Sequence, residues 1–156
     1  MSGHVSGVLP LVTVCDIDGV LADPGHRLHH VDGTSRDWEA FFAEAGQDPV
    51  IDEGREFVIQ ASSAGDAIVY LTGRPERLRA VTQAWLDHHR LPPGDLIMRG
   101  DDDRRPARVM KVQALRSIRR SRAIRDFLDD DSQVVSAAKA AGFAQALVPA
   151  WATRGL

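Results

Sequence analysis

The stretch LVTVCDIDGV, residues 11–20, joins a short apolar run to two carboxylates and a glycine. The β-branched run at 11–15 predicts a buried strand. Asp16 and Asp18 follow at i, i+2 spacing, which in an extended chain directs both carboxylates to one side. Crowding pushes the pKa values of two such carboxyls apart, so one suits a nucleophile or metal ligand and the other a proton carrier. Gly19 allows the backbone to turn away tightly.

Strand and helix patterns alternate along the rest of the chain. Short apolar runs predict further strands at residues 67–71, 96–98, 123–128 and 144–148. Helical spacing predicts helices at residues 37–45, 52–64, 109–118 and 132–141, and another after Pro75. This alternation predicts an α/β fold with a mostly parallel sheet, helices on both of its faces and a ligand site at the carboxyl ends of its strands.

The length and composition fit one globular domain. The chain has 156 residues, 44% of them hydrophobic and 26% charged, which excludes a disordered, collagen-like or membrane-spanning chain. We expect a flexible tail at 1–10, one domain at 11–149 with a small insert at 24–50, and a second tail at 150–156. The lone cysteine, Cys15, excludes an internal disulfide framework and indicates a reducing, cytoplasmic location. The apolar run before it is too short for a signal peptide or a membrane span.

The charge is distributed unevenly along the chain. The net charge of −3 argues against a general nucleic-acid binder, which would be clearly basic. Residues 104–125 nevertheless hold nine basic side chains and no acid, so the remainder of the chain is strongly acidic. Two interpretations stay open: a solvated helix face that reflects biased composition, or an anion-facing surface for a phosphorylated substrate.

Further polar groups follow the other predicted strands. Thr72 is a hydroxyl donor, and Gly73 is expected at a helix start, where free backbone N–H groups favour a phosphate. Pro75 suits the first turn of that helix. Lys111 lies early on the Arg-rich helix, and the three aspartates at 129–131 form an oxygen-rich cluster of the kind that Mg²⁺ prefers. Each signal alone is weak, but the ordered set indicates phosphate chemistry.

This ordered set resembles the haloacid dehalogenase (HAD) superfamily of phosphotransferases. The matching motifs are DIDGVLAD at 16–23, LTGRP at 71–75, Lys111, and LDDDSQVV at 128–135. More closely, the chain is similar to the phosphatase domain of phage-type polynucleotide kinase-phosphatase, on HRLHH at 26–30, DWEAFF at 37–42 and MRGDDDRRP at 98–106. The resemblance covers residues 11–149 and implies a Rossmann-like HAD core with a minimal cap insert.

The resemblance implies a mechanism that the residue chemistry supports. Asp16 would attack phosphorus and form an aspartyl-phosphate, which water later hydrolyses. Asp18 would protonate the leaving alkoxide and then activate that water. Thr72 and neighbouring amides would hold phosphoryl oxygens, and Lys111 would offset negative charge.

The same resemblance implies a set of ligands for Mg²⁺. Asp16, the carbonyl of Asp18 and the pair Asp129 and Asp130 would bind the ion, with Asp129 preferred as the direct ligand of that pair. Asp18 also separates phosphate monoester chemistry from the dehalogenase and phosphonatase relatives, which place no general acid there.

Four residues are implied for substrate binding. Arg27 and Arg74 match arginines that the polynucleotide phosphatase family uses around the phosphate, the alternative being surface ion pairs with nearby acids. Gly73 joins them through its amide, and Asp103 aligns with an acid near the third motif, although Ala107 stands where relatives have a second acid.

The insert also carries aromatic residues that either stack on a nucleobase or, more commonly, pack the insert over the sheet: Trp38, Phe41 and Phe42.

The sequence thus favours a Mg²⁺-dependent phosphatase that acts on a nucleic-acid 3′ end. The nearest rival is a 5′(3′)-nucleotidase acting on mononucleotides. A phospho-acceptor signalling domain and a non-catalytic HAD-like binding module are the remaining alternatives. No glycine precedes either lysine, so the chain has no Walker A loop for a kinase activity. No membrane partner is expected, and the oligomeric state stays open.

Overall fold

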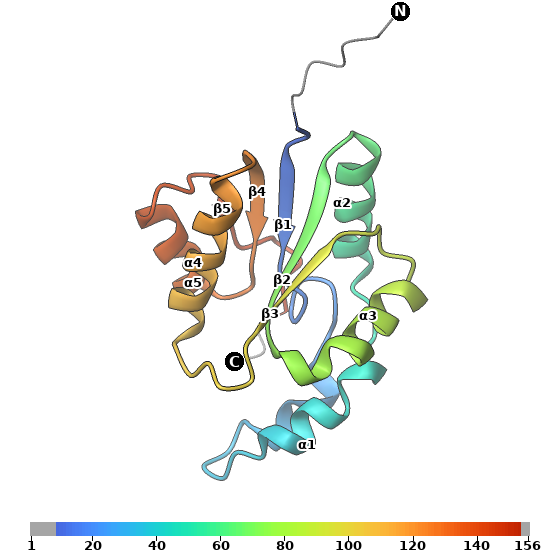
Figure 1. Ribbon diagram of the computed structural model, residues 1–156. Coiled ribbons are helices and arrows are strands. Elements are labelled where there is room, and N and C mark those ends of the chain that lie inside the picture. Colours follow the sequence, from blue (N-terminus) through green and yellow to red (C-terminus); the bar gives the residue numbers. More distant parts are fainter. Residues whose placement is uncertain (1–8, 154–156) are drawn as a thin grey trace, which may run out of the picture.

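A five-stranded, all-parallel sheet forms the centre of the computed structural model, which describes residues 9–153 (Figure 1). Its strand order is β3-β2-β1-β4-β5, and every neighbouring pair is parallel. The strands span Val12–Cys15 (β1), Ala67–Pro75 (β2), Asp95–Arg99 (β3), Ile124–Leu128 (β4) and Ala146–Leu147 (β5). The predicted α/β fold is confirmed. Of the two expected tails, residues 1–8 and 154–156 lie outside the described residues.

Helices cover both faces of the sheet, as predicted. Figure 1 shows α2 and α3 on one side of the sheet and α4 and α5 on the other. The α-helices span Trp38–Ala43 (α1), Asp52–Ser63 (α2), Arg79–His88 (α3), Ala107–Arg119 (α4) and Ser132–Ala140 (α5). Short 3-10 helices span Gly25–His30 (η1), Ala45–Gln47 (η2) and Glu76–Leu78 (η3). Within residues 9–153, none of these helices has the length and apolarity to cross a bilayer.

The alternation of side chains along β1 builds a separate core on each face. Val12 and Val14 point to the α4 and α5 side, whereas Cys15 points to the α2 and α3 side. Cys15 is buried, and burial, followed by the negative charge of Asp16, raises the pKa of its thiol well above the ordinary value. Cys15 therefore behaves as a small apolar group of the core.

Strand β2 is longer than the sequence predicted. It continues past residue 71 to Pro75, which pairs with Arg99 of β3 after a register irregularity. Pro75 has φ −69° and ψ 153°, so it ends the strand, and α3 begins only at Arg79, after the 3-10 turn. The expectation that Pro75 lies in the first turn of a helix is therefore wrong. Proline fixes φ near this value, which is compatible with both the first turn of a helix and the end of a strand. Pairing with β3 selects the extended conformation at Pro75.

The loop after β1 turns tightly beside the site. Gly19 has φ +84°, and a Cβ there would collide with the Asp130 side chain and the Thr153 carbonyl, so only glycine fits. The described part of the expected C-terminal tail contacts this loop: the Thr153 amide donates to Gly19 O at 2.8 Å, and Trp151 Nε1 donates to Val20 O at 3.1 Å. Figure 1 shows the short helices of the 24–50 segment below the carboxyl ends of the strands.

Candidate active site

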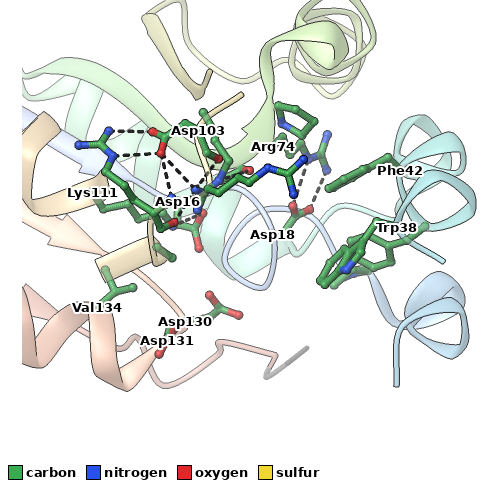
Figure 2. Close-up of a pocket in the computed structure, with 18 of the residues that line it drawn as sticks. Asp16, Asp18, Trp38, Phe42, Arg74, Asp103, Lys111, Asp130, Asp131 and Val134 are labelled. Atoms are coloured by element: carbon green, nitrogen blue, oxygen red, sulfur yellow. Dashed lines mark hydrogen bonds and ion pairs between the residues drawn. The ribbon is translucent and has the colours of Figure 1, made fainter. Parts of the chain in front are cut away.

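A pocket of about 820 Å³ opens at the carboxyl ends of the strands (Figure 2). Its wall comes from the β1 loop, α1, the ends of β2 and β3, the start of α4 and the β4–α5 loop. Most of the residues expected to form the site line it: Asp16, Asp18, Gly73, Arg74, Asp103, Lys111, Asp129 and Asp130. Two expected residues, Thr72 and Arg27, are fully buried and lie outside the lining.

Lys111 connects the ends of β1 and β4. Its Nζ atom lies 3.1 Å from Asp16 Oδ1 and 2.6 Å from Asp129 Oδ2. Burial alone would lower the pKa of Lys111, but the two carboxylates raise it above the ordinary value, so the amine stays protonated. The lysine thereby holds two carboxylates from different strands side by side.

A third carboxylate, that of Asp130, lies beside the two that Lys111 contacts. Asp16, Asp129 and Asp130 each offer an oxygen within 4.8 Å of the other two. Burial and then the charge of Asp129 raise the pKa of Asp16, and burial raises the pKa of Asp130 to about 6. One ammonium against three carboxylates leaves excess negative charge, which a cation would offset.

Asp18 is held by two buried arginines. Its Oδ1 accepts from Arg27 at 2.8 Å and from Arg74 at 2.7 Å, and its Oδ2 accepts a third bond from Arg74 at 3.1 Å. Burial alone would raise the pKa of Asp18, but the charge of Arg74 and then of Arg27 lowers it below the ordinary value. Both arginines thus form the ion pairs that the sequence left as an alternative, although inside the protein and not at its surface.

Asp48 completes this network, and the sequence gives no sign of it. Its side chain is fully buried and accepts two bonds from Arg27, each at 2.7 Å, and one from Arg74 at 3.3 Å. His26 lies 2.7 Å from the same carboxylate. Asp48 lies in a loop without hydrophobic periodicity, and the need for a second carboxylate beside the two arginines becomes evident only once the structure shows that they are buried.

Thr72 and Gly73 differ from their expected settings. The Thr72 hydroxyl accepts from the Arg74 amide at 3.1 Å and is buried, so it supports the end of β2. Gly73 lies inside β2 and not at a helix start, because the strand continues beyond it, so the expected free helix N–H group does not exist there. Gly73 still lines the pocket, and its carbonyl accepts from Arg99 Nε at 3.3 Å.

The basic segment at 104–125 divides between the pocket and other surfaces. Arg104, Arg105 and Lys111 line the pocket, whereas Arg119 lies over the Phe143 ring and Arg125 pairs with Asp66. Asp103 also lines the pocket, and its closest cationic partner is Arg105, at 2.7 Å. Within residues 9–153, Arg104 has neither an ion pair nor a side-chain hydrogen bond, and it is exposed. Only the start of the segment therefore faces the pocket, among the described residues.

Comparisons with known proteins give one family and a consistent fold. The family model described as the polynucleotide kinase PNKP phosphatase domain matches residues 10–148. No curated protein is a significant match to the sequence. Two solved structures of a Pnkp1/Rnl/Hen1 complex, one described as an RNA repair complex, are similar at 23% identity with TM-score 0.75 and at 24% identity with TM-score 0.76. Each comparison covers 90% of this chain but only 42% and 46% of the other, so this chain spans less than half the length of those proteins.

A further solved structure extends the likeness to another phosphatase. The class C acid phosphatase from Bacillus anthracis with tungstate bound has 16% identity and TM-score 0.65, over 91% of this chain and 67% of that one. At such identities, these structures show a shared fold.

The buried network around Asp48 predicts a large loss of stability when its carboxylate is removed. Asp48→Ala leaves Arg27 without its two-point partner, and breaking a buried ion pair costs about 3–5 kcal/mol of unfolding free energy. As a control, Glu76→Ala removes a solvent-exposed ion pair with Arg79 and should leave the free energy of unfolding nearly unchanged. Urea unfolding measures both, and equal small losses would contradict the structural role of Asp48.

Proposed function

Because this chain belongs to the family of polynucleotide kinase PNKP phosphatase domains, and is thus an HAD-type phosphatase, we propose that it removes the 3′-phosphate from nucleic-acid ends. The observation that carries the proposal is one pocket that joins the Lys111-bridged carboxylates to Asp18. Asp16 and Asp18 there have separate partners, as a nucleophile and a proton carrier require.

The proposed reaction has two steps, and Asp16 takes part in both. An Asp16 carboxylate oxygen attacks phosphorus, the bond to the leaving oxygen breaks, and Asp18 gives that oxygen a proton. Water then attacks the aspartyl-phosphate, Asp18 takes the proton of that water, and inorganic phosphate leaves Asp16 free. Lys111, at 3.1 Å from Asp16, orients the nucleophile and offsets charge that develops beside it.

The arginine pairs of Asp18 favour its second task. Arg74 and Arg27 stabilise the carboxylate, which is the base that the hydrolysis of the aspartyl-phosphate needs. The first step needs the protonated acid. We infer that a phosphate oxygen competes with Asp18 for Arg74, which lines the pocket, and that this competition raises the pKa of Asp18. Arg27, outside the lining, would keep the carboxyl in place.

The donor set fits Mg²⁺, the usual metal of HAD phosphatases. Asp16, Asp129 and Asp130 offer carboxylate oxygens, which are hard ligands that together carry excess negative charge. The main-chain carbonyl of Asp18 would add a fourth oxygen ligand. Both oxygens of Asp129 already accept bonds, from Lys111 and from the Asp131 amide. The preference for Asp129 over Asp130 as direct ligand stays a prediction. When bound, Mg²⁺ would offset the charge of the phosphoryl oxygens beside Asp16.

A polynucleotide substrate is favoured over a mononucleotide by the arginines on one side of the pocket. Arg99, Arg104 and Arg105 all line it, and Arg104 is exposed and available for a second phosphate group. The likeness to chains of an RNA repair complex supports a repair role. The single buried cysteine fits the cytoplasmic location expected from the sequence.

The roles of the two aspartates predict different losses. Asp16→Asn should abolish phosphate release in the presence of Mg²⁺, because an amide neither attacks phosphorus nor replaces the charge. Asp18→Asn should cost about 10²–10⁴-fold in kcat with an alkyl phosphate. The loss should be smaller with p-nitrophenyl phosphate, whose leaving group needs no proton. Steady-state release of phosphate measures each, and equal losses with both substrates would refute the acid role of Asp18.

Salt dependence separates polymer from mononucleotide. A 3′-phosphorylated oligonucleotide should be turned over faster than a nucleoside 3′-phosphate, and its kcat/KM should fall more steeply with NaCl. Arg104→Gln should reduce the slope of log kcat/KM against log salt by about 1 for the oligonucleotide. Arg120→Gln, an exposed arginine outside the pocket lining, is the matched control and should leave the slope unchanged. Equal turnover of the two substrates would contradict the polymer assignment.

A further inference from the structure

One wall of the pocket is aromatic, and the proposed reaction assigns it no task. Trp38 and Phe42 both come from α1 and line the pocket. Their rings are stacked, with centroids 5.9 Å apart and planes inclined by 30°. Trp38 is 38% exposed although it is a large apolar residue. A pair of partly exposed rings inside this pocket is suited to contact a substrate.

Phe41 is the buried member of this aromatic cluster, and the rings of Trp38 and Phe42 both contact it. Phe41 is buried, and the Arg27 guanidinium lies over its ring at 4.1 Å. That contact joins α1 to the arginine network under Asp18. All three aromatic residues border the pocket, but Phe41 is buried, whereas Trp38 is exposed and Phe42 is half-buried.

Arg77 links the aromatic wall to the loops that follow β2 and β3. Its guanidinium lies 5.7 Å from the centroid of the Phe42 ring and 2.6 Å from Glu39 of the same helix. Its backbone amide donates to Asp101 Oδ1 at 3.0 Å. Since Arg77 follows β2 and Asp101 follows β3, this bridge connects α1 to the loops on the other side of the pocket.

The reaction geometry places the leaving group near these rings. In a phosphoryl transfer, the attacking and leaving oxygens lie roughly in line on opposite sides of phosphorus. Asp16 attacks from the Lys111 side, so the leaving oxygen lies toward Asp18, which protonates it. Across the view of Figure 2, Asp16 and Lys111 lie on one side, Trp38 and Phe42 on the other, and Asp18 between them. Whatever the leaving oxygen carries therefore faces the aromatic wall.

We propose that Trp38 and Phe42 form the binding subsite for the nucleobase of the 3′-terminal nucleotide, with the base stacked on Trp38. This assignment rests on the proposed function, which makes the leaving oxygen the 3′ oxygen of a nucleoside. Every base presents a π face, so the subsite accepts any of them and selects nucleoside-bearing phosphates over other monoesters.

A terminal abasic site provides the direct test. The substrates are a 3′-phosphorylated oligonucleotide and the same oligonucleotide with a tetrahydrofuran residue in place of the terminal nucleoside. In the wild type, kcat/KM should be about 10-fold to 100-fold higher with the base present, mainly through KM. In Trp38→Leu, which keeps apolar bulk without the ring, this ratio should fall toward 1. Trp38→Phe should restore most of it.

Two further variants keep the outcome decisive. Phe42→Leu should also lower the ratio, which covers the case in which Trp38→Leu does not fold. Val109→Ala, an exposed apolar residue on α4 outside this pocket, is the control and should keep the wild-type ratio. A wild-type ratio in both Trp38→Leu and Phe42→Leu would overturn the subsite while leaving the 3′-phosphatase intact. A wild type that hydrolyses neither oligonucleotide would overturn the proposed function, and the subsite with it.

Discussion

A single buried ammonium group holds the ends of two strands together at the pocket. Lys111 Nζ lies 3.1 Å from Asp16 Oδ1 and 2.6 Å from Asp129 Oδ2, and all three side chains are buried. Without the lysine, the carboxylates that follow β1 and β4 would repel each other in a medium of low dielectric. The first turns of α4 carry the lysine to that position, so the sheet, the helix and the site depend on the same contacts.

The charges of the pocket separate into two groups with different balance. Around Asp18, two arginines face two carboxylates, so that group is neutral without any ligand. Around Asp16, one lysine faces three carboxylates, so that group carries excess negative charge and would repel a phosphate. The neutral group keeps Asp18 and its arginines in place. A bound cation would stabilise the acidic group by reducing the repulsion between its carboxylates, and it would also attract the phosphate.

The features of the site that follow from strand ends could be predicted from the sequence. Asp16, Lys111 and Asp129 lie where a parallel sheet brings its carboxyl ends together, and hydrophobic periodicity places those ends within a few residues. The extension of β2 to Pro75 could not be predicted, because it depends on pairing with β3, a contact between distant segments. Asp48 could not be predicted either, because its partners Arg27 and Arg74 meet it only in the folded chain.

Thermal unfolding with and without Mg²⁺ tests the central claim, that the three carboxylates around Lys111 form a cation site. Mg²⁺ at about 100 times its Kd should stabilise the wild type by about 2.7 kcal/mol relative to EDTA. Asp130→Asn should be at least as stable as the wild type in EDTA, because one fewer carboxylate repels the other two. Mg²⁺ should stabilise this variant much less than it stabilises the wild type. An unfolding temperature that Mg²⁺ leaves unchanged in the wild type, or an Asp130→Asn protein less stable than the wild type in EDTA, would contradict the account.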